Sequence, residues 1–347
     1  MVNSGAASIV HNALFAEMHR KHERFLANPR TGTQIVLTNT TVRKVHTTET
    51  DLRAACFIGV SFHECAFIRS NLDDSNFELS KVFASNLEGS SFRKARLKGI
   101  CLRGTSMKNV DLSDADLGPA TLTLAGGTLN SDLSDVDLER SNMKRADLQG
   151  ADLRRSNLFE CDLEGAKLRG ARLQDANLSG ANLARADMRG ADLTNCHLRN
   201  ARIHGADLTG ATLEGAKIFL GLSSFDKATQ KALMLHVEWV MSEGRKGRRA
   251  VLQNAKFFKS NFAHAELSCA DLSGSDLRHA DLTEAFLAGT DLRNADLSGA
   301  AVAGADLRGA DLTGAKLDDV DLDSAQTGAL TIASRAGTTK LDTKISD

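Results

Sequence analysis

Residues 146–158 read ADLQGADLRRSNL, and this stretch decides the fold. Leucine returns at every fifth position, with Ala or Ser two places before it and Asp or Asn directly before it. In an α-helix, which turns by about 100° per residue, such leucines would spiral around the axis. In a strand they would point alternately to opposite faces, because side chains there have a period of two. Neither regular element explains a period of five.

The same register runs through most of the chain. Every fifth residue is Leu, Phe, Met or Val at 15 positions from Leu52 to Leu122, and apolar at 18 positions from Leu133 to Ile218. Another 15 positions follow from Leu252 to Leu322, which makes 48 units in total. Leu37 and Val42 extend the first block backwards, with Thr47 as a gap. Leu122 and Leu133 are eleven residues apart, so we expect one added residue between these two blocks.

Each unit of five has one large and one small residue suited to burial, and three residues suited to solvent. Asp and Asn favour turns, because their side chains bond to nearby backbone groups. A chain that runs straight for a few residues and then bends, once every five residues, keeps all its leucines inside. Four such sides close a square coil of twenty residues. Successive coils then pair as parallel strands about 4.8 Å apart, and leucines twenty residues apart stack in columns.

The tandem A-(D/N)-L-x-x pattern resembles the pentapeptide-repeat proteins over roughly residues 37–325. The resemblance implies an all-β repeat solenoid, a right-handed quadrilateral parallel β-helix, which in this family often begins with a capping helix. In such a solenoid each coil contacts only its neighbours, so the terminal coils need caps.

Two segments without the five-residue pattern resemble each other. His22 and Phe25 in the first align with His236 and Trp239 in the second, and Leu26 aligns with Val240. The His lies 15 residues before the first repeat leucine in one segment and 16 in the other. Each segment contains a helical pattern of apolar residues; Gly244 marks the end of the second helix. The predicted apolar faces comprise Ile9, Val10, Ala13, Leu14 and Met18, and Phe225, Ala232, Leu233, Val237, Val240 and Met241.

These patterns divide the chain into five predicted regions. We expect a helical cap over 1–36, a β-helix over 37–218, a helical insertion with a basic loop over 219–251, a second β-helix segment over 252–326, and a loosely packed tail over 327–347. The insertion either lies on the side of one continuous β-helix or separates two of them, and the sequence leaves both arrangements open.

Composition excludes several classes of protein. The chain has 347 residues and a net charge of −1, with 42% apolar and 25% charged residues, which is typical of a folded soluble protein. It has no apolar run long enough to span a membrane and no signal-peptide pattern at its start. Six scattered cysteines without a C-x-x-C pair favour neither zinc nor disulfides. We therefore expect a reducing, cytoplasmic location.

No motif indicates catalysis, a cofactor or a metal. The glycine-rich basic stretch 244–249 (GRKGRR) lacks phosphate-loop spacing and follows a helix instead of preceding one. His11, His19 and His22 fit one helix face but have no acidic or cysteine partners at ligand spacing. Cys161 and Cys196 occupy the small inward position and are expected in the core. We assign no catalytic, cofactor-binding or metal-binding residues and expect a protein that is not an enzyme.

Charge provides the candidate interaction residues. The stretch 93–108 holds six Lys or Arg and no acid, block 131–217 is balanced with 14 acids and 13 bases, and block 251–323 holds 13 acids and 6 bases. Such segregation steers partners. The candidate residues come from the basic stretch and from the turn after the second helix: Arg93, Lys94, Arg96, Lys98, Trp239, Arg245, Lys246, Arg248 and Arg249.

Two functions remain open. The first is a rigid scaffold that binds another protein, because the repeat places its large apolar residues inside and leaves its faces free. The second follows from the resemblance: some pentapeptide-repeat proteins mimic duplex DNA and bind gyrase, which here would use the acidic C-terminal segment as the mimic. Direct nucleic-acid binding is not expected. An open β-helix end would also allow a homodimer, because unpaired strand edges invite pairing.

Overall fold

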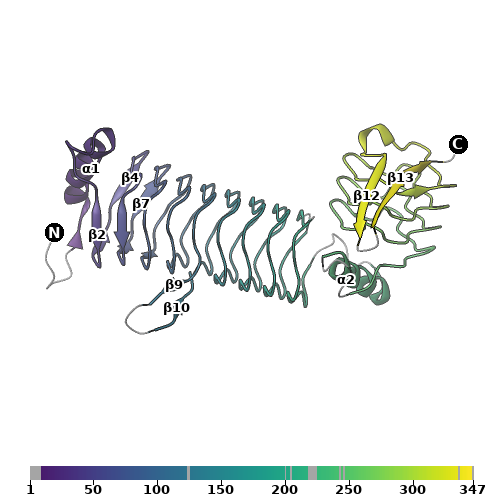
Figure 1. Ribbon diagram of the computed structural model, residues 1–347, viewed down its shortest axis with the longest axis horizontal. Helices are drawn as coiled ribbons and strands as arrows, with labels where there is room; N and C mark the ends of the chain where they lie inside the picture. Colours follow the sequence, from purple (N-terminus) through teal and green to yellow (C-terminus); the bar gives the residue numbers. More distant parts are fainter. Residues whose placement is uncertain are drawn as a thin grey trace. The chain divides into compact units, whose positions relative to one another are not determined.

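The computed structural model describes residues 9–122, 126–199, 201–203, 205–217, 225–241, 244, 247–334 and 337–345. The chain divides into two compact units, the first comprising Met1–His197 and Thr209–Ala216, the second Leu198–Leu208 and Lys217–Asp347. Each unit contains a stack of parallel coils with a helix at its N-terminal end (Figure 1). The second helix lies at the N-terminal end of the second unit's own stack of coils.

The regular elements are short because each side of a coil is only a few residues long. They are β1 (Ile9–Val10), α1 (Asn12–Ala27), β2 (Val36–Thr38), β3 (Thr41–Arg43), β4 (His46–Thr48), β5 (Cys56–Ile58), β6 (Ser61–His63), β7 (Ala66–Ile68), β8 (Lys81–Phe83), β9 (Ala120–Thr121), β10 (Thr128–Leu129), α2 (Lys227–Met241), β11 (Asp311–Leu312), a 3-10 turn (Leu322–Ser324), β12 (Ala329–Ser334), β13 (Gly337–Asp342) and β14 (Lys344–Ile345).

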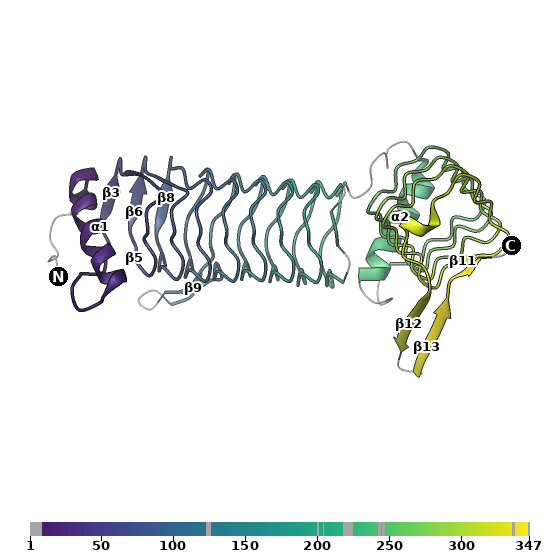
Figure 2. The same ribbon diagram turned by 90° about the horizontal axis from the view of Figure 1, so that it is seen from above.

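The predicted twenty-residue coil is confirmed by the strand pairing. Val36–Thr38 of β2 pairs in parallel with Cys56–Ile58 of β5, and isolated bridges repeat the same step further on, as from Asp152 to Arg172. Backbone hydrogen bonds join consecutive coils: the Leu148 N–H donates to the Lys167 carbonyl at 2.8 Å. The coils seen in Figure 2 are therefore one continuous set of parallel ladders within each unit.

Two local devices turn the corner of each coil. The Asp or Asn before the column residue accepts a hydrogen bond from the N–H two residues later, as from Ser113 to Asp111 Oδ1 at 2.9 Å. The residue two places after the column residue has a positive φ, +65° at Gly150 and +55° at Arg145. Glycine adopts this conformation without steric cost, whereas Arg145 is held there by its neighbours. The second device explains why Gly recurs in that slot.

The stacked column residues form the core. Leu148, Leu168 and Met188 lie one coil apart, and each is at most 1% exposed. The small residue two places earlier is buried as well, as at Ala146 and Cys161. Burial of each large side chain contributes about 1.5–3 kcal/mol before the entropy of ordering the chain is subtracted.

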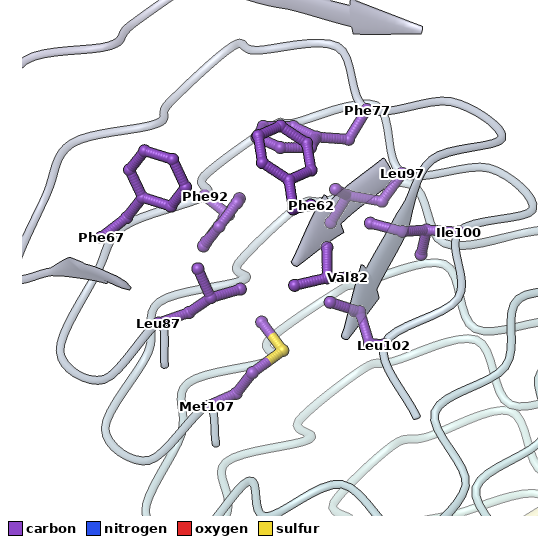
Figure 3. A pocket seen from close by; sticks show the side chains of 10 residues that line it. All are labelled: Phe62, Phe67, Phe77, Val82, Leu87, Phe92, Leu97, Ile100, Leu102 and Met107. Carbon is purple, nitrogen blue, oxygen red and sulfur yellow. The ribbon is translucent and has the colours of Figure 1, made fainter. Parts of the chain in front are cut away.

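Aromatic residues fill the N-terminal coils, and aliphatic residues replace them further on. The Phe57 and Phe77 rings lie 4.8 Å apart between centroids, and Phe77 and Phe92 lie 5.7 Å apart. At the transition a void of about 10 Å³ remains between Phe62 and Met107, lined only by apolar side chains (Figure 3). A dry gap of this size reflects imperfect packing and is not a ligand site.

The predicted single added residue is wrong: an entire hairpin is inserted. Cys101 bridges to Asp132, 31 residues later instead of 20, so eleven residues leave the coil. Within them β9 and β10 pair in antiparallel orientation, and Leu122 lies half-buried outside the column. Eleven residues equal two five-residue units plus one residue. In the sequence, the insertion therefore looks like two further repeats and a single added residue.

The buried face of α1 also differs from the prediction. Ile9 and Val10 form β1, which pairs with β3, and Leu14 is 48% exposed. The helix instead buries Phe15 and His22. Phe15 contacts Phe67 at 5.7 Å between ring centroids and covers the first coil.

The second unit is capped in a similar way at its start. Helix α2 buries Leu233 and Val237, as predicted. Phe225, directly before the helix, stacks on Phe262 at 5.6 Å and meets Phe257 edge-on at 5.2 Å. These rings cover the end of the first coil of this unit.

The C-terminal tail is more ordered than predicted. Strands β12 and β13 form an antiparallel hairpin, and β14 pairs in parallel with β11 on the last coil. Leu330 and Leu341 lie over Gly309, where a Cβ atom would come within 3.0 Å of both side chains. Glycine at this corner therefore leaves room for the hairpin to pack against the coil. The Ser/Thr/Lys-rich composition of the tail gave no indication of this packing.

Replacement of Leu178 by Asp tests the inward column. Leu178 is fully buried, so the substitution removes a large apolar contact and buries an unpaired carboxylate, at a cost of at least ~3 kcal/mol. Urea unfolding of the first unit measures the loss. Ser179→Asp, one residue further along the same turn and partly exposed, serves as the control and should change stability little. Equal stability of the two variants would contradict the assignment.

Candidate interaction surfaces

The two caps share one hydrogen-bond device. His22 and His236 are both fully buried. The Nδ1 atom of His22 accepts the Ile35 N–H at 3.1 Å, and Nδ1 of His236 accepts the Ala250 N–H at 3.1 Å. Each imidazole therefore ties its helix to the start of the first coil. The alignment of the two segments predicted from the sequence is confirmed by these bonds.

An aromatic ring stacks on each of these histidines. Phe25 lies on His22, and Trp239 lies on His236, both at 5.8 Å between centroids and 19° between planes. Phe25 and Trp239 are half-buried, so each cap presents part of an aromatic ring at the surface. The N–H of Gly244 donates to the Trp239 carbonyl at 2.8 Å with φ of +79°, which ends this helical segment as predicted.

The two caps differ at the second imidazole nitrogen. The Nε2 atom of His22 donates to the Arg53 carbonyl at 3.0 Å, whereas Nε2 of His236 has no hydrogen-bond partner among the described residues. Burial lowers the pKa of His236 to about 4, against the opposing influence of the buried Glu266 carboxylate and with a smaller contribution from Arg249. Burial also lowers the pKa of His22. Both side chains are therefore neutral near pH 7.

The basic turn after α2 is partly described. Arg248 and Arg249 are exposed, and the Arg248 N–H donates to the Leu235 carbonyl at 2.9 Å, which fixes the turn against the helix. Arg245 and Lys246 lie outside the described residues. Arg248, Arg249 and Trp239 thus belong to the same cap.

The basic stretch 93–108 does not form a free cationic patch. Arg93 pairs with Asp73 at 2.6 Å, Arg96 with Glu78 at 2.8 Å, and Lys98 with Asp116 at 3.2 Å. Arg103 and Lys108 are likewise paired, with Asp135, Asp137 and Glu139. Among the described residues, Lys94 has no ion pair within 4 Å; the pKa of the Asp114 carboxyl group is lowered mainly by its hydrogen bond from Arg145, with a smaller contribution from the charge of Lys94.

The same compensation extends over both units. Arg155 pairs with Asp135 and Arg172 with Asp152 on adjacent coils of the first unit. Arg278 and Arg293 in the second unit pair with the Asp two residues earlier. Exposed pairs of this kind contribute at most about 1 kcal/mol each to stability. Over block 131–217, which lies mostly in the first unit and has 14 acids and 13 bases, the charges are thus largely neutralised locally; block 251–323 of the second unit keeps an excess of acids, 13 against 6 bases.

The described residues hold no cluster of three or more side chains suited to a metal ion. Burial raises the pKa of the Cys161 and Cys196 thiols to about 12, so these groups are not nucleophiles near pH 7. Both cysteines are buried in the core, as predicted. Within the described helices, none has the length and apolar character needed to cross a bilayer.

One exposed feature escaped the sequence analysis. Phe258 is 49% exposed, with Lys259 Nζ at 5.2 Å and the Arg278 guanidinium at 5.5 Å from its ring centroid. It directly follows the column residue Phe257. An apolar residue in that normally polar position was the signal that could have revealed it.

A comparison with protein families matches the chain to the pentapeptide repeats, in eight copies at residues 48–81, 85–109, 130–158, 156–195, 176–215, 248–283, 270–309 and 290–326. The matched residues make up more than half of the chain, which therefore belongs to the pentapeptide-repeat family, and its fold is the right-handed parallel β-helix of that family. No curated protein sequence matches it.

Solved structures of the family resemble parts of the chain. HetL, a regulator of heterocyst differentiation from Nostoc sp. strain PCC 7120, is 22% identical, covers 87% of this chain and 94% of its own, and has a TM-score of 0.35. Full-length QnrB1, a plasmid-mediated fluoroquinolone resistance protein, is 17% identical over 64% of this chain and 96% of its own, at 0.29. Rfr23 from Cyanothece 51142 is 28% identical, covers 36% of this chain and 90% of its own, and has a TM-score of 0.20. The family assignment rests on the repeats themselves.

Acid should weaken the second cap through His236. Because the folded-state pKa of about 4 lies below the ordinary value of 6.5, the stabilisation is complete above pH 6.5 and is lost as the pH falls towards 4, by about 3 kcal/mol in total. His236→Asn places an acceptor that does not titrate opposite the Ala250 N–H. We expect this variant to be less acid-sensitive than the wild type over that interval.

Trp239 is the only tryptophan of the chain, so its fluorescence during urea unfolding at several pH values reports on this cap. His22→Asn is the matched control, because it makes the same substitution in the cap of the other unit and should leave the Trp239 transition unchanged. An identical pH dependence for wild type and His236→Asn would contradict the assignment.

Proposed function

We propose that the protein is a non-enzymatic scaffold whose outer surface and projecting segments bind another protein. The observation that carries this proposal is the division of the side chains. Apolar residues fill the columns, while many of the outward charges are paired on the same coil or with the next one. The described surface has no constellation of nucleophile, acid and base. The two units offer ordered surfaces for docking, nearly balanced in charge over residues 131–217 and acidic over residues 265–323.

The hairpin β9–β10 is the docking element that we favour. It leaves the coil at the eleven-residue insertion and projects from the side of the first unit (Figure 1). Leu129 at its base is 43% exposed, one of few large apolar side chains on the described surface with such exposure. Exposed apolar groups on a projecting segment are typical of binding sites.

The cap of the second unit is a further docking region in this proposal, with Trp239, Arg248 and Arg249 as contact residues. Arg93, Arg96 and Lys98 contribute less, because each is already engaged by an acid. The homodimer through an open β-helix end remains a prediction. On the last coil of the second unit, β14 covers one side of that end by pairing with β11.

Deletion of residues 119–129 tests the hairpin. The deletion places Leu133 five positions after Leu117 and so restores the regular register; we expect an unchanged circular dichroism spectrum and unfolding temperature. Affinity purification from the source cells, with quantitative mass spectrometry, should recover a partner in stoichiometric amount with the wild type and at least about tenfold less with the deletion, as expected for loss of a central contact.

Leu129→Ser is the milder companion variant and should weaken the same interaction without altering the fold. Recovery of the same proteins in the same amounts by wild type and deletion would exclude the hairpin as the docking element. Absence of any protein enriched by the wild type over a denatured control would contradict the scaffold function itself.

A second candidate, mimicry of duplex DNA towards gyrase, has one supporting observation. Asp271, Asp291 and Asp311 occupy the same position on consecutive coils of the second unit, and residues 251–323 carry a net charge of −7. Four coils span about 19 Å, which is one net charge per about 2.7 Å, against about 1.7 Å in duplex DNA. Arg293 and Lys344 further neutralise Asp291 and Asp311. The acidic surface is therefore short and dilute compared with DNA.

We accordingly expect no effect on gyrase. In a supercoiling assay with purified gyrase, up to about 10 µM of the protein should neither inhibit the reaction nor protect it from a quinolone, since no continuous acidic face is available. Inhibition at low micromolar concentration that is lost in Asp271→Asn/Asp291→Asn/Asp311→Asn would establish the mimic and displace the scaffold proposal.

A further inference from the structure

Charge is strongly segregated along the second unit. Residues 247–264, which comprise the turn after α2 and most of the first coil, hold four Lys or Arg and no Asp or Glu, a net charge of +4. Residues 265–323 hold four Lys or Arg and thirteen Asp or Glu, a net charge of −9. The unit therefore has a positive end and a negative end along its coil axis.

The positive end includes an exposed aromatic residue on one edge of the coils. Phe258 and Lys259 lie on the first coil, and Arg278 and His279 lie at the same two positions on the second. All four are exposed. Arg278 is also paired with Asp276 at 2.8 Å, so among the described residues Lys259 is the main uncompensated cation of this edge. The ring of His279 meets Phe258 edge-on at 5.8 Å between centroids, and the two cations lie within 5.5 Å of the phenyl centroid. We call these four residues the basic edge.

The negative end lies on the same edge. At the same two positions as Phe258 and Lys259, the third coil has Ser298 and Gly299, and the fourth coil has Asp318 and Asp319. Both aspartates are exposed, and within the part of the chain that the structure describes neither forms an ion pair within 4 Å; Asp318 accepts a hydrogen bond from the Ser298 hydroxyl at 3.5 Å. One edge of the second unit thus begins with cations around a phenyl ring and ends with two carboxylates.

This arrangement is self-complementary under a two-fold rotation. The two-fold axis lies in the contact plane between the second and third coils and is perpendicular to the coil axis. It pairs the first coil of one copy with the fourth coil of the other, and the second with the third. Each position along the side of a coil then faces the same position in the other copy. Lys259 of one copy then faces Asp319 of the other. Asp318 faces Phe258 and the Arg278 guanidinium beside its ring. Each contact occurs twice, once in each direction.

Other arrangements are less favourable. Parallel pairing of two units would place cations against cations and carboxylates against carboxylates. A long polyanion such as a nucleic acid would meet the net −9 of the following coils as well as the basic edge. The antiparallel pair has one unfavourable position, where Lys256 faces Lys316, but Lys316 is compensated by Asp296 at 3.4 Å.

We propose that the second units of two copies of this protein associate side by side in antiparallel orientation, through the basic edge of each copy and Asp318 and Asp319 of the other. An edge of four coils is only about 19 Å long, so the contact is smaller than the roughly 800 Å² per partner of a stable interface. The dimer is therefore weak, forms at high protein concentration, and dissociates as salt screens its charges.

The test is sedimentation equilibrium of the full-length protein over a wide concentration range at low salt. The wild type should show a monomer–dimer equilibrium that 0.5 M NaCl abolishes. Lys259→Glu and Asp319→Lys should each lower the association constant by about tenfold or more, because like charges then face each other twice. The chain that carries both substitutions should regain most of the wild-type association, since the swapped charges again face each other.

Arg20→Glu on the exposed surface of α1 provides the matched control and should leave association unchanged. Circular dichroism of each variant confirms that the coils remain folded. A monomer at all concentrations would overturn the proposal, as would a double variant no better than the single ones. A dimer unaffected by Lys259→Glu but lost in Leu317→Asp would place the contact at the open coil end instead. None of these results bears on the docking of other proteins at the β9–β10 hairpin.

Discussion

Closure of the backbone every twenty residues is the constraint on which the rest of the structure depends. Most five-residue sides end in a residue with positive φ, and many begin with an Asp or Asn that bonds the turn, so four sides return the chain to its starting edge. The N–H of a column residue can then bond to the next coil, as Leu148 does to Lys167. Because non-glycine residues such as Arg145 also adopt the corner conformation, stacking must compensate for its local cost.

This closure changes which residues are neighbours. On the outer surface a side chain lies beside those twenty residues away, so the charge of a sequence segment says little about the charge of a surface. The stretch 93–108 contains only basic charges, yet acids from adjacent coils meet most of them, as Asp73 meets Arg93. Along the second unit the segregation extends over several coils and persists in space. A functional surface is therefore to be sought where charge varies along the coil axis.

The coil period, the inward columns and the paired caps were predictable from sequence, because each produces a repeated pattern. The match of His22 to His236 was visible for the same reason. The inserted hairpin was not, since eleven residues shift a period of five by one position and Leu122 fell on the expected register. The face of α1 was misassigned because the helix buries Phe15 and His22, whereas Leu14 is exposed and Ile9 lies before the helix in β1. Phe258 occurs once and belongs to no repeated pattern, so its exposure was not predicted. Its contact with Arg278 joins neighbouring coils, twenty residues apart in the sequence.

A through-hydrogen-bond scalar coupling in the deuterated, labelled protein tests the central claim most directly. The stacked coils predict couplings from the amide nitrogen of Leu148 to the carbonyl carbon of Lys167 and, across the inserted hairpin, from Leu112 to Asn142, whose N···O distances are 2.8 and 2.7 Å. Detection of both would establish the ladder and its longer step. A coupling from Leu112 to Ser131 instead, or helical couplings four residues apart through residues 133–198, would contradict the account.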